Sequence, residues 1–107
     1  MGTKRRPVAL TYGDAGEVPT PPRLTKTQQN IFRMLKDGRP HSRNAIKSLL
    51  PDDLAGDTAV TFHISVIRTR LDIQGCGYGI VPVQVQNSLH YQLIRFVGEV
   101  FSESIAN

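Results

Sequence analysis

The chain has 107 residues, 39% of them hydrophobic, so we expect one small domain with its own core. A single cysteine, Cys76, excludes an internal disulfide, and no apolar run approaches the roughly 18 residues of a membrane span. We therefore expect a cytoplasmic protein without membrane contact. The net charge of +4 favours a polyanionic partner. Residues 1–50 hold ten basic against three acidic residues, whereas residues 51–107 hold three against six.

The first part of the chain predicts extended structure. Residues 1–7 are expected to form a basic, flexible arm that ends at Pro7, and residues 8–12 suit a short strand. A turn is predicted at residues 13–16. Residues 17–23 contain Pro19, Pro21 and Pro22, which restrict them to an edge strand or an extended connector.

Two helices are predicted next. Thr25 and Gln28 have the spacing of a capping box at the start of the first helix, which Gly38 ends. The second helix is expected to begin at Ser42, a good N-cap residue, and to stop at Pro51. The positions predicted to face the core are Ile31, Phe32, Leu35, Ile46, Leu49 and Leu50.

The strongest pattern predicts a third helix over residues 57–72, with Asp57 as its N-cap. Apolar residues recur there at i, i+4, i+7 and i+11, which defines one buried face: Val60, Ile64, Ile67 and Leu71. The opposite face carries short hydrogen-bonding side chains and a cation: Thr58, Thr61, Ser65, Arg68 and Thr69. Such a helix is either an ordinary amphipathic surface helix or one that a core can present to a DNA groove.

A hairpin is predicted over residues 80–94. Its first strand, residues 80–85, contains Pro82 and is therefore expected at a sheet edge or a bulge. After a turn at 86–88, the returning strand places Leu89, Tyr91 and Leu93 on one face. Residues 96–107 predict a short amphipathic helix that covers the core or a partner.

Residues 60–71, Val-Thr-Phe-His-Ile-Ser-Val-Ile-Arg-Thr-Arg-Leu, resemble the recognition helix of the winged-helix effector domains of OmpR/PhoB-type response regulators. The family pattern there is Val-Asp-Val-His-Ile-x-x-Leu-Arg-x-Lys-Leu. Leu24-Thr25 and Ser42-Arg43 resemble the openings of its two preceding helices, and the resemblance spans about residues 8–93. It implies an α+β winged helix-turn-helix fold: a three-helix core with N-terminal strands, a C-terminal β-hairpin wing and a short C-terminal helix. The domain would occupy residues 8–95, between the arm 1–7 and the tail 96–107.

The same resemblance implies sequence-specific binding of double-stranded DNA in transcription regulation. Helix 57–72 would enter the major groove and hairpin 80–94 would lie along the minor groove. By position, Phe62 and Val66 would face base edges, and Ser65, Arg68, His63 and Tyr91 would contact phosphate. Arg43 and Lys47 would add to the attraction for phosphate. The full set of residues expected to bind DNA is Arg43, Lys47, Thr58, Thr61, Phe62, Ser65, Val66, Arg68, Thr69, Asn87 and Tyr91.

Two departures from the family keep a second interpretation open. Val66 stands where the family often has a base-reading arginine, and the wing tip around Asn87 has no basic residue. Phe62 and Val66 could read thymine methyl groups or form a protein-binding patch. The alternative is therefore a winged-helix interaction module for a homodimer, a polymerase subunit or another regulator, through Phe62 and Val66 or residues 96–105.

Catalysis is not expected. The spacing of His41, His63, His90 and Cys76 fits no zinc pattern, and nothing brings a serine, histidine and aspartate together. We expect neither a metal ion nor a cofactor.

Overall fold

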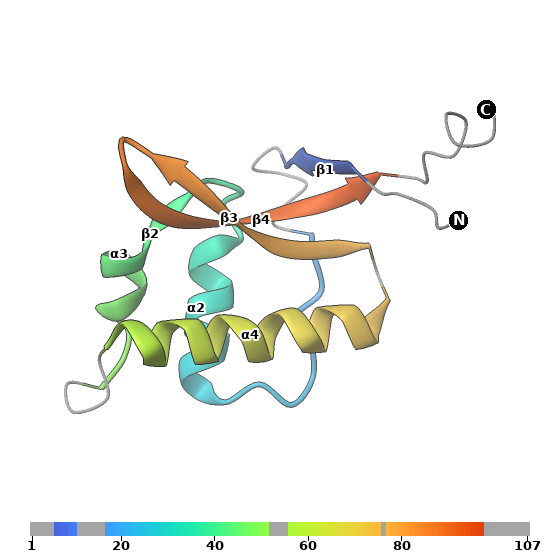
Figure 1. Ribbon diagram of the computed structural model, residues 1–107. Coiled ribbons are helices and arrows are strands. Elements are labelled where there is room, and N and C mark those ends of the chain that lie inside the picture. The colour runs from blue at the N-terminus through green and yellow to red at the C-terminus, as the bar shows by residue number, and fades with distance from the viewer. Residues whose placement is uncertain (1–5, 11–16, 52–55, 76, 98–107) are drawn as a thin grey trace.

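The computed structural model describes residues 6–10, 17–51, 56–75 and 77–97 (Figure 1). These residues form an α+β domain in which an antiparallel sheet lies along one side of three helices. The elements in chain order are β1 (Arg6–Ala9), α2 (Lys26–Leu35), β2 (His41–Ser42), α3 (Arg43–Lys47), α4 (Asp57–Gln74), β3 (Tyr78–Val85) and β4 (Ser88–Val97).

Strand β4 is the centre of the sheet. It pairs with β3 along one edge and with β1 and β2 along the other, always antiparallel. Val85 pairs with Ser88, so a two-residue turn connects β3 to β4. Both turn residues, Gln86 and Asn87, have positive φ, of 52° and 65°, as a type I′ hairpin turn requires. Among the described strands, β3 pairs only with β4 and is therefore an edge strand, which confirms the position predicted from Pro82.

The predicted starts of α2 and α3 are confirmed. The Gln28 amide donates to Thr25 Oγ1 at 3.2 Å, and the Thr25 amide donates to Gln28 Oε1 at 3.0 Å. Ser42 Oγ accepts from the Ala45 amide at 3.0 Å at the start of α3. These side chains satisfy amides that have no partner within the helix.

The predicted cap of α4 was wrong. Gly56 is the N-cap and makes no side-chain bond, while Asp57 is the first helical residue and pairs with α3. The helix runs two residues past the predicted end, to Gln74, and Gly75 caps it in the left-handed conformation at φ 68°. The second helix, α3, is shorter than predicted: it ends at Lys47, before the predicted stop at Pro51.

Several strand boundaries also differ from the prediction. The first strand begins at Arg6, inside the predicted arm, because β1 pairs with residues 94–97. Residues 96 and 97 continue β4 and are not part of a helix, since they pair with β1. Residues 17–25 contain no strand, so this segment is a connector. The predictions for residues 1–5, 11–16, 52–55 and 98–107 lie outside the described residues.

The core lies between the helices and the inner face of the sheet. All four residues of the predicted buried face of α4 are at most 1% exposed. They pack with residues from the other elements into one cluster, whose further members include Leu24, Ile31, Phe32, Leu35, Ile46, Leu50, Ile80, Tyr91 and Leu93. Because four positions of α4 face inward, its opposite side is left at the surface. No helix within the described residues is long and apolar enough to cross a bilayer.

Candidate nucleic-acid interface

The outer face of α4 gathers most of the residues predicted to bind DNA. Thr58, Thr61, Ser65 and Thr69 are exposed, and Phe62 is 59% exposed. Val66 is half-buried and, with Phe62 and Ser65, lines a shallow depression on this face. The helix therefore presents short hydroxyl groups next to an apolar patch.

One member of this patch, Ile73, was not predicted from the sequence. Its side chain is 71% exposed, the most exposed of the large hydrophobic residues in the described chain. Phe62, Val66, Thr69 and Ile73 recur at i, i+4, i+7 and i+11, which is the spacing of one helix face. The signal was present in the sequence, since Ile73 falls outside the register of the buried face.

His63 lies on the flank of α4 that faces α2. The Gln28 side chain is 3% exposed and its Nε2 lies 3.1 Å from His63 Nδ1. Because Gln28 Oε1 already accepts from Thr25, Nε2 points to His63 and donates, so Nδ1 is the acceptor. Burial lowers the pKa of His63 below its ordinary value. The ring also meets Phe62 edge-on, with centroids 5.4 Å apart. His63 therefore supports Phe62 and α2, with Nδ1 unavailable to a phosphate.

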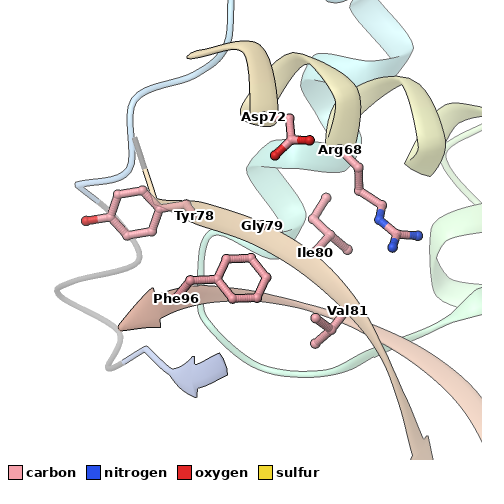
Figure 2. A pocket seen from close by; sticks show the side chains of 7 residues that line it. All are labelled: Arg68, Asp72, Tyr78, Gly79, Ile80, Val81 and Phe96. Atoms are coloured by element: carbon pink, nitrogen blue, oxygen red, sulfur yellow. The ribbon is translucent and has the colours of Figure 1, made fainter. Parts of the chain in front are cut away.

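Arg68 lies on the opposite flank, beside the β3–β4 hairpin. It lines a cleft of about 200 Å³ between α4 and the start of β3 (Figure 2). Figure 2 shows the guanidinium group extending from α4 beside Ile80, with the Asp72 carboxylate one turn further along the helix. Arg68 is exposed at the junction between the outer face of α4 and the hairpin.

Gly79 shapes the other wall of this cleft. A Cβ at this position would lie 2.7 Å from Cε2 of Phe96, so only glycine lets that ring lie against β3 without a shift. Figure 2 shows the Phe96 ring beside the Gly79 backbone. The close packing joins the ends of β3 and β4 where the hairpin meets α4.

The two basic residues of α3 converge on one carboxylate of α4. Lys47 Nζ lies 2.9 Å from Asp57 Oδ1, and Arg43 Nη2 lies 3.4 Å from Asp57 Oδ2. The bond from Lys47, and then the charges of Arg43 and Lys47, lower the pKa of Asp57 against the opposing effect of desolvation. Both predicted phosphate contacts thus already hold an anionic group. This triad was not predicted from the sequence, because Asp57 was expected to be the helix cap.

Of the two hairpin residues predicted to bind DNA, one lies at the surface and the other is buried. Asn87 is exposed at the turn, as predicted. Tyr91 is 6% exposed and belongs to the core, as the alternation along β4 predicts. Its side chain is therefore not offered to phosphate as the resemblance implied. Around the turn the surface is polar and uncharged, with exposed Gln84, Gln86 and Ser88.

Within the described residues, no group of three or more His, Cys, Asp or Glu side chains is placed to hold a metal ion. Comparisons with protein-family models, with curated proteins and with solved structures find no match for this chain.

Proposed function

We propose that the chain is a winged helix-turn-helix domain that binds double-stranded DNA in transcription regulation. The order helix, short strand, helix, helix, hairpin supports this proposal, because a core behind α4 leaves its outer face free. Helix α4 would enter the major groove and the β3–β4 hairpin would serve as the wing along the neighbouring minor groove. The observation that carries the proposal is the exposed face of α4, an 18-residue helix flanked by the hairpin.

The dimensions and chemistry of α4 suit this role. An 18-residue helix is about 27 Å long, and a helix fits the B-DNA major groove, which is about 12 Å wide. Thr58, Thr61, Ser65 and Thr69 can exchange hydrogen bonds with bases or phosphates, and Phe62 and Val66 can contact thymine methyl groups. Arg68 would contact the backbone between the groove and the wing.

The experiment is a titration of a short, labelled, mixed-sequence duplex, followed by fluorescence anisotropy at several salt concentrations. The proposal predicts micromolar or tighter binding at low salt. The logarithm of the binding constant should fall linearly with the logarithm of the salt concentration, by about 0.9 for each phosphate contact. The absence of binding at low salt would contradict the proposal.

A second candidate function rests on a different observation. The apolar stripe of Phe62, Val66 and Ile73 could be covered by a second copy of the chain or by a protein of the transcription machinery. Sedimentation velocity over a range of concentrations tests the homodimer. A single monomeric species that binds duplex DNA would favour the first function.

A further inference from the structure

The triad of Arg43, Lys47 and Asp57 is the one place in the described chain where two basic side chains share an acidic group. Their side chains are 38%, 31% and 54% exposed, so water and solutes reach all three. An ion pair this accessible to water contributes little to the stability of the fold. Another anion can therefore replace the Asp57 carboxylate without a large loss of stability.

The triad adjoins the face proposed for DNA. Asp57 is the first residue of α4. Thr61, one turn further along the exposed face, donates from Oγ1 to the Asp57 carbonyl oxygen at 3.1 Å. Arg43 and Lys47 lie one turn apart on α3, and both reach Asp57. Their two cationic groups are thus held toward a single anion beside the candidate groove-binding helix.

We propose that Asp57 competes with the DNA backbone for Arg43 and Lys47, an inference that rests on the proposed function. Its carboxylate occupies the place of a phosphate between Arg43 and Lys47, and a DNA phosphate takes that place on binding. Asp57 then weakens DNA binding in two ways: it must be displaced, and its charge repels the incoming backbone. Only DNA sequences that make enough other contacts with α4 to offset this cost are therefore bound tightly.

The test compares Asp57→Asn with the wild-type chain in the anisotropy titration. Asn keeps the shape of the side chain and removes its charge. We expect binding of the mixed-sequence duplex to tighten several-fold. The salt slope should stay within about 1 of the wild-type value, since the same phosphate lies between Arg43 and Lys47 in both complexes.

The control for net charge is Glu17→Gln, which removes the same charge from an exposed residue of the connector between β1 and α2. Adding Lys47→Ala to Asp57→Asn should remove most of the gain, because the released lysine provides it. Asp57→Ser should behave as Asp57→Asn does, and thermal unfolding followed by circular dichroism checks that each variant folds.

Four outcomes are decisive. A gain specific to Asp57→Asn and lost with Lys47→Ala supports the proposal. If the wild type binds DNA and Asp57→Asn binds equally well, more weakly, or no better than Glu17→Gln, the competitor role is overturned and the DNA-binding function stands. A gain that is undiminished in the Lys47→Ala background overturns it as well. If neither the wild type nor Asp57→Asn binds duplex DNA at low salt, the competitor role and the proposed function both fall.

Discussion

Gln28 on α2 and His63 on α4 are joined by a partly buried hydrogen bond of 3.1 Å between the two helices. Gln28 Oε1 also accepts from the Thr25 amide, so one side-chain amide connects the cap of α2 to α4. Rotating the amide would reverse its donor and acceptor and break both bonds. Protonated His63 has no acceptor at Nδ1, and the bond from Gln28 would be lost.

This arrangement predicts that the domain becomes less stable as the pH falls below about 6.5. Burial lowers the pKa of His63 in the folded state, whereas the unfolded chain keeps the ordinary value of about 6.5. Above that value His63 is neutral in both states and its contribution is fully present. As the pH falls through it, the unfolded state takes up more protons, so the free energy of unfolding decreases. Urea unfolding at pH 7.5 and pH 5.5 measures this change.

The control for this pH effect is His63→Gln, which does not titrate. His41 and His90 are the same in both proteins, so the difference between the two pH dependences isolates His63. The variant should lose less stability than the wild type between the two pH values. Equal losses would mean that His63 does not carry the effect.

The capping box of α2 predicts a measurable cost for Thr25→Ala. The substitution removes the hydroxyl that accepts from the Gln28 amide, and loss of such a cap costs about 1 kcal/mol of the free energy of unfolding. Thr69→Ala, on the exposed face of α4, is the matched control and should stay within about 0.5 kcal/mol of the wild type. Chemical denaturation measures both; equal effects would argue against the cap.

Two isoleucines of α4 predict opposite results for the same substitution. Ile67 is fully buried, so Ile67→Ala should cost about 2–5 kcal/mol through lost burial and the cavity left behind. Ile73 is 71% exposed, so Ile73→Ala should change the free energy of unfolding by no more than about 0.5 kcal/mol. Urea denaturation of the two variants checks the register of the helix. Similar costs at both positions would contradict the placement of α4.

The sequence was sufficient to predict the elements in which local pattern and tertiary contacts agree. The period of Val60, Ile64 and Ile67 predicted the buried face of α4 correctly, because a single helix face packs on one core. The capping box and Pro82 were equally informative, since hydrogen bonding between near neighbours and the missing amide of proline act locally.

The errors have a common physical cause, which is contact between residues distant in sequence. Asp57 has the side chain of a good N-cap, but Lys47, ten residues earlier, binds its carboxylate, and Gly56 takes the cap. Strand β2 has only two residues and exists because His41 and Ser42 pair with β4. Neither contact leaves a periodic signal in the sequence.

The position of Arg68 predicts a loss of salt dependence when it is replaced. If its guanidinium group contacts a phosphate, Arg68→Ala should weaken binding of all duplexes by a similar factor and reduce the salt slope by about 1. Arg33→Ala is the matched control, because it removes the same charge from the exposed side of α2. Anisotropy titrations at several salt concentrations measure both slopes. An unchanged slope for Arg68→Ala would contradict the proposed orientation of α4 on DNA.

The apolar residues of the exposed face distinguish the two proposed functions. If α4 reads DNA, Phe62→Ala combined with Val66→Ala should alter the preferred sequence, because contacts with thymine methyl groups are lost. Binding to a mixed-sequence duplex should change little, since phosphate contacts supply most of it. If the face instead binds a second copy of the chain, the double variant should sediment as a monomer under conditions where the wild type dimerises. Selection of preferred duplexes and sedimentation velocity on the same two proteins therefore separate base reading from self-association. Ile73→Ala, at the end of the stripe, provides a third substitution, which should weaken the dimer and leave the preferred DNA sequence unchanged.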